Sequence, residues 1–218
     1  MLSDELYRVR YRHIKEVSRL LADCFYSDPL YCKLIKDDEL RRKALPEIFE
    51  CYFDMIYDFS YIYADSAQIN GVVILFDSKE DAYSQPLKSY RRSVADCCWK
   101  TLKVITKYSF GPSALVSYFK HVGALKTSWI NKESLGDYLH VDILAVKPSM
   151  MGKGIASKLM APVLRYADEN RLETALETNN LQNVQIYKHY GFHMSKDFVL
   201  PDGVKQFCMI RKTSAVQA

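Results

Sequence analysis

The stretch Leu144–Ala156 combines residue types that can bind an anion through the backbone. An apolar run ends at Val146, and Gly152 and Gly154 punctuate a turn before a helical pattern begins near Ile155. Glycine has no Cβ, so its backbone bends tightly and brings several N–H groups close to a bound anion. The positive end of the following helix adds to that attraction. The spacing indicates a phosphate cradle, although the same glycines would also suit a plain surface turn.

Two nucleotide-binding motifs do not match this turn. A P-loop ends in Gly-Lys-Ser or Gly-Lys-Thr, whereas Ile155 follows Gly154 here. A dinucleotide-binding fingerprint requires a third glycine where Ser157 stands, and it normally opens a fold rather than closing it. The cradle therefore calls for a different phosphate ligand.

Two titratable residues stand on the predicted strand 138–146 that leads into the turn. Period-two alternation places His140 and Asp142 on one face of that strand. The opposite face is expected to carry Val141, Ile143 and Ala145. Polar residues on an otherwise apolar strand need an explanation. In the structural alternative, His140 is merely hydrogen-bonded and Asp142 pairs with a neighbouring Arg or Lys.

Hydrophobic periodicity predicts the elements that must position these residues. The expected strands are 6–11, 61–64, 72–76, 138–146 and 174–178, with an antiparallel hairpin at Asn70-Gly71 and a final hairpin around residues 201–203. The expected helices are 14–25, 38–59, 154–170 and 183–189. An insert of about 84–131 has helical spacing and is divided at Gly111-Pro112. The Asp28-Pro29 dipeptide ends the first helix, a break is expected at Pro46 and a kink at Pro162. This order predicts an α/β fold with parallel pairing at its centre.

Composition limits the class of protein. With 218 residues, 49% of them hydrophobic, the chain is expected to form a single domain over 1–218 with a short polar tail at 213–218. A net charge of +4 is too small to predict binding to nucleic acid. The sequence has neither a run of 18 apolar residues nor a signal peptide, so a cytoplasmic protein without a membrane segment is expected. The six cysteines have no zinc-site spacing, which predicts no metal and reduced, mostly buried thiols.

Two spaced motifs resemble the GNAT superfamily of acyl-CoA-dependent N-acetyltransferases. The first is Ala145-Val146-Lys147-Pro148 followed by Gly152-Lys153-Gly154, and the second runs from Leu176 through Asn183 to Tyr187 and on to Phe192. Ser149 stands where the family usually has Arg or Gln. The chain also resembles the branch that includes puromycin-type acetyltransferases. The resemblance implies a central mixed, mostly antiparallel sheet with a parallel central strand pair, flanked by helices, with the helical insert before the central strand.

The resemblance also implies roles for individual residues. Tyr187 would donate a proton to the CoA sulfur, and His140 first and Asp142 second would act as the base. The pantetheine arm of acetyl-CoA would pair with the backbone of Leu144, Ala145 and Val146, near Asn183. The pyrophosphate would lie on Met151, Gly152, Lys153, Gly154, Ile155 and Ala156. Lys188 and Tyr190, together with Lys153, would lie towards the nucleotide end.

The function expected from this resemblance is transfer of an acetyl group from acetyl-CoA to a primary amine of a small molecule. Two alternatives stay open at this point. One is a non-catalytic acyl-CoA-binding sensor or interaction protein, and the other is an acetyltransferase for amines of proteins or peptides. The aromatic and basic insert, with the turn at 25–35, is the expected wall of the acceptor pocket. A homodimer is a possible assembly if the aromatic residues of the insert are exposed.

Overall fold

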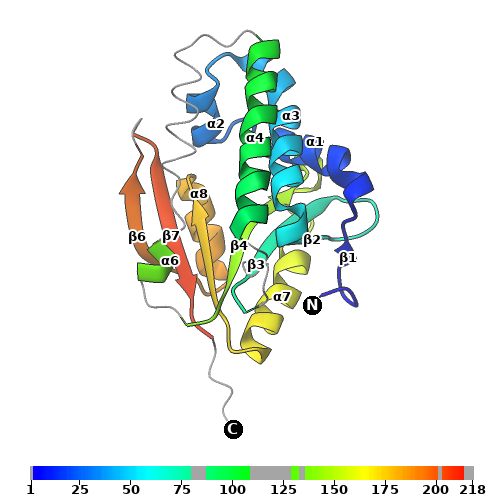
Figure 1. Ribbon diagram of the computed structural model, residues 1–218. Helices are drawn as coiled ribbons and strands as arrows, with labels where there is room; N and C mark the ends of the chain where they lie inside the picture. The colour runs from blue at the N-terminus through cyan, green and yellow to red at the C-terminus, as the bar shows by residue number, and fades with distance from the viewer. Residues whose placement is uncertain (1, 80–86, 109–128, 133–135, 201–202, 214–218) are drawn as a thin grey trace.

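The computed structural model describes residues 2–79, 87–108, 129–132, 136–200 and 203–213 (Figure 1). Within these residues the strands form a seven-stranded sheet in the order β1-β2-β3-β4-β5-β7-β6. β4 and β5 pair in parallel, and all other neighbouring pairs are antiparallel. The expected mixed sheet with a parallel central pair is confirmed. The strands are β1 (Tyr7–Arg8), β2 (Tyr61–Ala64), β3 (Gly71–Asp77), β4 (Tyr138–Val146), β5 (Glu173–Thr178), β6 (His193–Val199) and β7 (Lys205–Arg211).

Helices cover both faces of this sheet (Figure 1). They are α1 (Ile14–Phe25), α2 (Pro29–Leu34), α3 (Asp38–Ile56), α4 (Leu87–Lys107), α6 (Trp129–Lys132), α7 (Ile155–Glu169) and α8 (Leu181–His189). On one face, buried residues of α1 and α3 pack with Ile74 and Ala145. On the other face, α7 and α8 pack with Val73 and Val141. Successive residues of the central strands therefore serve two separate hydrophobic cores.

The β2–β3 hairpin is antiparallel, as expected. Gly71 is the first residue of β3 rather than part of the turn. A Cβ atom added to Gly71 would lie 2.7 Å from Cγ2 of Ile155 and 3.0 Å from Cδ1 of Leu159. Glycine at this position therefore lets the first turn of α7 lie directly against the sheet.

The segment from Phe25 to Ile35, expected to be a turn, contains the helix α2. Asp28 is its N-cap residue and accepts a hydrogen bond of 2.9 Å from the backbone N–H of Leu30, while Pro29 stands in the first turn. The dipeptide ends α1 as predicted. It also starts the next helix, because proline suits the first helical position and aspartate suits the N-cap.

The expected break at Pro46 is wrong, since α3 runs through that residue without interruption. Leu45 and Phe49 are buried on either side of it. Their packing holds the helix together although proline removes one backbone hydrogen bond. α7 likewise runs through Pro162, which is itself buried.

The expected helical insert is represented by α4 and α6 in the described residues, whereas its division at Gly111-Pro112 lies outside them. All six cysteines are free thiols, as expected. Only Cys51 and Cys208 are buried, so the expectation of mostly buried thiols is wrong. In the part of the chain that the structure describes, we find no helix with the length and apolar character needed to cross a membrane.

Candidate active site

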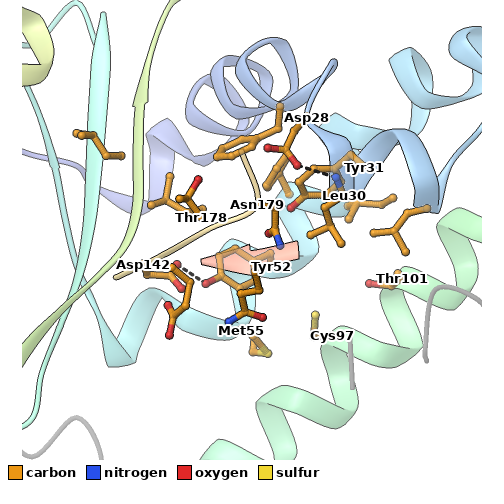
Figure 2. A pocket seen from close by; sticks show the side chains of 18 of the residues that line it. Asp28, Leu30, Tyr31, Tyr52, Met55, Cys97, Thr101, Asp142, Thr178 and Asn179 are labelled. Carbon is orange, nitrogen blue, oxygen red and sulfur yellow. Dashed lines mark hydrogen bonds between the residues drawn. The ribbon is translucent and has the colours of Figure 1, made fainter. Parts of the chain in front are cut away.

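A cavity of about 370 Å³ opens where the parallel strands β4 and β5 stop pairing. Their register ends at Val141 and Leu176, beyond which β4 continues to Val146 and β5 to Thr178. Residues of both strand ends line the cavity, together with residues of α1, α2, α3, α4, α8 and β7. Figure 2 shows the side chains of this wall, which come from segments far apart in the sequence. The parting of the two strands thus creates the space for a ligand.

β4 carries a bulge at Asp142. The pairing with β3 shifts between Ile74 and Leu75, whose partners are Ile143 and Val141, so Asp142 has no partner residue on β3. An extra residue of this kind locally disrupts the ladder and redirects the side chains around it. Asp142 lines the cavity, and its carboxylate accepts a hydrogen bond from the hydroxyl of Tyr52 on α3 (Figure 2).

The bulge also corrects the predicted alternation. Val141 packs in the core beneath α7, but Ile143 and Ala145 pack in the opposite core, beneath α1 and α3. The expectation that these three residues share one face is therefore wrong, because the extra residue inverts the alternation. Asp142 and Ile143 both line the cavity as a result.

His140 lies behind the cavity wall in a hydrogen-bonded cluster. Its Nε2 atom is 2.7 Å from Oε2 of Glu177 on β5, and the indole N–H of Trp129 donates to the other oxygen of that carboxylate. The His140 ring also stacks on Phe76, with centroids 6.2 Å apart. Glu177 lines the cavity, whereas His140 is buried with 5% exposure and is not part of the described lining.

Burial and charge act against each other on His140. Burial lowers the pKa of the imidazole, but the Glu177 carboxylate at hydrogen-bond distance and the nearby Asp142 reverse this effect, so its pKa is raised. For Asp142, burial raises the pKa, and it stays raised although His140 and the Tyr52 hydroxyl act to lower it. A carboxyl with a raised pKa is a better proton acceptor near neutral pH.

Tyr187 projects from α8 into the same cavity. Its side chain is 8% exposed and packs edge-on against Phe192, with ring centroids 5.9 Å apart. Burial, with a smaller contribution from Tyr190, raises the pKa of its hydroxyl to about 12. The hydroxyl therefore keeps its proton throughout the neutral range and can donate it.

The glycine turn has the geometry of a backbone anion cradle. Gly152 and Gly154 both have φ of +75°, in the left-handed region, and a Cβ on either would meet no described atom within 4 Å. Glycine is needed for backbone conformation rather than for room. Gly154 is the N-cap of α7 and provides no capping side chain, and the first helical turn contains no acidic residue. The N–H groups of Ile155 and Ala156 in this turn are thus oriented to bind an anion.

The other candidate ligand contacts surround this turn. Met151 and Lys153 are exposed, and the Lys153 ammonium lies 3.5 Å from the sulfur of Met150. The Tyr190 hydroxyl, at the end of α8, lies 3.0 Å from that of Ser157 on α7. Lys188 is exposed on α8. Met151, Lys153 and Lys188 are therefore accessible from solvent.

The end of β4 leads from the cavity to the glycine turn, and the start of α8 also lines the cavity. Leu144 and Asn183 line the cavity, and Asn183 donates a hydrogen bond of 3.3 Å to the hydroxyl of Thr178. The carbonyl of Val146 accepts a hydrogen bond of 3.1 Å from the Cys24 thiol, which fixes the end of β4 to α1. A ligand that extends from the cradle into the cavity would therefore pass along the last residues of β4.

The comparisons with known proteins agree with this geometry. The family model of the acetyltransferase (GNAT) domain matches residues 117–213, which include β4, the glycine turn, β5 and α8. This part of the chain is similar to the GNAT acetyltransferase domain. The matched part begins ahead of the parallel strand pair and extends past the last strand, β7.

Other acetyltransferases are similar to this chain over most of its length. An uncharacterized N-acetyltransferase of Schizosaccharomyces pombe is 23% identical over 192 residues, which cover 85% of this chain and 72% of the yeast protein. A solved Corynebacterium glutamicum structure of histone acetyltransferase HPA2 and related acetyltransferase has a TM-score of 0.64 at 15% identity and covers 98% of both chains. A Drosophila melanogaster polyamine N-acetyltransferase has a TM-score of 0.55 at 14% identity, covering 95% of this chain and 98% of its own. The fold is that of these acetyltransferase structures.

Every residue that the sequence nominated for the GNAT site lies along β4, the glycine turn or α8, and the sequence missed others. Glu177 and Tyr52 were not nominated, although the first bonds to His140 and the second to Asp142. Glu177 had a sequence signal, because it is an acidic residue in the apolar strand next to the motif at Asn183. Tyr52 had none, since a tyrosine on the apolar face of a helix resembles any core aromatic residue. The structural alternative predicted that Asp142 pairs with an arginine or a lysine. In the structure, Asp142 instead accepts a hydrogen bond from Tyr52.

Proposed function

We propose that the protein transfers an acetyl group from acetyl-CoA to a primary amine of a small molecule. The observation that carries the proposal is the meeting of Asp142, Glu177 and Tyr187 around one cavity at the parting of β4 and β5. A group that can accept a proton and a group that can donate one face the same space. The amine acetylation named for the Drosophila neighbour supports an amine as acceptor.

The residues fit acetyl-CoA as co-substrate. The glycine turn offers backbone N–H groups to the pyrophosphate. The end of β4, where its pairing with β5 has stopped, offers backbone groups on that side to the pantetheine arm. Lys153, Lys188 and Tyr190 are proposed to lie towards the nucleotide. Bound acetyl-CoA supplies the activated acetyl group as a thioester.

The proposed proton transfers use residues on both sides of the cavity. An alkylamine with a pKa of about 10.4 is protonated at pH 7, so it must lose a proton before its nitrogen can attack. Asp142 accepts that proton. The His140 imidazole, hydrogen-bonded to Glu177, lies nearby and favours the ionised form of Asp142. As the C–N bond forms and the C–S bond breaks, Tyr187 donates its proton to the departing sulfur. The nitrogen then loses its second proton, which returns through water to the Tyr187 oxygen, and Asp142 releases the first proton to solvent. Both nominated bases thereby keep a role, with Asp142 in direct contact with the amine.

A non-catalytic acyl-CoA sensor is the rival proposal, and Ser149 in place of the usual Arg or Gln is the residue that favours it. Thiol release from acetyl-CoA, followed with a panel of primary amines, separates the two. We expect thiol release that depends on the added amine. Tight binding of CoA in calorimetry, with no thiol release for any amine or peptide, would leave only the sensor.

The remaining features belong to the same proposal. We propose one cytoplasmic domain over residues 1–218, related to the puromycin-type branch, that uses no metal. Among the described residues, no group of three or more His, Cys, Asp or Glu side chains could hold a metal ion. A homodimer stays an optional assembly, to be tested by light scattering.

A further inference from the structure

Three aromatic rings form a continuous part of the cavity wall. Phe25 of α1, Tyr31 of α2 and Phe49 of α3 all line the cavity, and each ring lies within 5.7 Å of the other two, centroid to centroid. The aliphatic side chains of Leu30 and Leu34 extend this wall along α2. Rings at these distances present a large apolar surface that suits another ring or a compact hydrocarbon group.

The charged groups of the cavity all have the same sign. Among the described residues that line it, the charged ones are Asp28, Asp142 and Glu177, with no lysine, arginine or histidine. Such a cavity attracts a cation and repels a carboxylate, since juxtaposed like charges are costly where little water is present. An acceptor that carries its own carboxylate beside the amine, as an amino acid does, fits poorly.

Asp28 differs from the other two carboxylates because it is already used by the fold. It is the N-cap of α2 and accepts a hydrogen bond of 2.9 Å from the backbone N–H of Leu30 (Figure 2). The positive end of that helix faces its charge. A second ammonium group on the ligand would therefore find no spare carboxylate on the α2 side of the cavity, where the aromatic wall stands.

We infer that the acceptor is an apolar monoamine: one ammonium group at Asp142 and Glu177, a ring-sized hydrocarbon body against Phe25, Tyr31 and Phe49, and no carboxylate. This inference rests on the proposed function and names the substrate class of that site. It disfavours polyamines, amino acids and the lysine side chains of proteins.

Matched small amines test the inference directly. Phenylalanine is phenethylamine with an added carboxylate. 1,4-Diaminobutane has a second ammonium group where phenethylamine has an aromatic ring. We expect kcat/KM for phenethylamine to exceed that for each of the others by about 10²-fold or more, as one misplaced charge in a dry site implies. Equal or greater kcat/KM for phenylalanine or for the diamine would overturn the inference.

A substitution in the cavity wall tests the role of charge independently. Cys98 lines the cavity from α4 and is exposed, so an altered side chain there is compatible with folding. Cys98→Glu adds an anion on that wall. The ratio of kcat/KM for the diamine to that for phenethylamine should rise about two- to fivefold, as expected for an added ion pair at a partly exposed position. Cys98→Gln has the same size without the charge and should not raise this ratio; a rise in both variants would contradict the charge argument.

Calorimetric titration of the CoA-bound protein with the same amines separates this inference from the proposed function. Selective binding of phenethylamine without turnover of any amine would remove the proposed function and keep the apolar monoamine as ligand. Turnover with a preference for the diamine or the amino acid would keep the function and overturn the inference. Neither binding nor turnover of any amine would overturn both.

Discussion

At the scale of single residues, burial raises the pKa of Tyr187 and that of Asp142, with opposite chemical consequences. The tyrosine, with a pKa of about 12, remains a proton donor throughout the neutral range. The aspartate holds a proton more readily than an ordinary carboxylate does. One cavity therefore prepares a donor and an acceptor by the same means, the exclusion of water.

Tyr187→Phe should lower kcat by roughly 10²- to 10⁴-fold, the usual contribution of a positioned proton donor. Binding of CoA should change little, because the ring and its contact with Phe192 are kept. Stopped-flow measurement of thiol release and calorimetry with CoA give the two quantities. Tyr61→Phe on β2, which is outside the cavity lining, is the control. Unchanged kcat in Tyr187→Phe would remove the tyrosine from the mechanism.

The pH dependence of kcat/KM should respond to the neighbours of Asp142. The reaction requires the ionised carboxylate, so the rate falls as the pH drops through its pKa. Protonated His140 and the Tyr52 hydroxyl both lower that pKa. His140→Gln or Tyr52→Phe should therefore move the acidic limb of the profile to higher pH, measured over about pH 5–9, the range in which tuned acids and bases titrate. A limb that stays in place, or moves to lower pH, would show that Asp142 is not the base.

Candidate residues could be predicted where they stand at recognisable positions of a sequence motif. Strand position drew attention to His140 and Asp142, and the resemblance to the GNAT motifs gave these two residues and Tyr187 their roles. Asp142 and Tyr187 line the cavity, whereas His140 lies behind its wall. Glu177 and Tyr52 could not be assigned, because their roles depend on the contact of β5 with β4 and of α3 with the bulge. Such contacts arise from tertiary packing, which the local sequence does not encode.

At the scale of secondary structure, two local features differ from the sequence predictions of strand alternation and of a turn at 25–35. The bulge at Asp142 inverted the alternation after that residue, and Asp28-Pro29 started a helix where a turn was expected. A bulge depends on the register with β3, so strand periodicity cannot place it. The aspartate–proline pair suits the end of one helix and the start of the next equally well, and only packing decides whether a second helix follows.

The glycine turn gives a test at this scale. Gly154→Ala keeps the cradle sterically open but places a Cβ on a residue with φ of +75°. The cost should be about 1–2 kcal/mol. Urea denaturation should reveal this loss, and calorimetry should show weaker CoA binding as the turn relaxes. Gly136→Ala is the matched control, since Gly136 is not among the described residues with positive φ and its Cβ would meet nothing within 4 Å. Equal effects of the two substitutions would contradict the conformational argument.

At the scale of the whole molecule, the last strand is joined to the cradle helix by an ion pair. The Arg211 guanidinium on β7 donates two hydrogen bonds, of 2.8 and 2.7 Å, to the Asp168 carboxylate on α7. Their side chains are 13% and 25% exposed. This pair ties β7 to α7, the helix that begins at the glycine turn.

Asp168→Asn should lower the free energy of unfolding by about 1–3 kcal/mol, because hydrogen bonds to a half-buried charge are lost. Glu5→Gln serves as the control. This substitution breaks the ion pair between Glu5 and Arg165, whose side chains are 43% and 53% exposed, respectively. The loss should lower the free energy of unfolding by about 1 kcal/mol or less. Urea denaturation of both variants at neutral pH gives the comparison. Equal losses would mean that the Arg211 pair contributes no more than a surface pair.

The central claim is that an amine loses its proton to Asp142 and takes the acetyl group in the cavity between β4 and β5. The most direct measurement is steady-state formation of the acetylated amine, quantified by mass spectrometry against released thiol, in the wild-type protein and in Asp142→Asn. The account predicts one acetylated amine for each thiol released by the wild type. It also predicts a rate lower by roughly 10²- to 10⁴-fold in the variant with CoA affinity retained. Equal rates in the two proteins, or thiol release without acetylated amine, would contradict it.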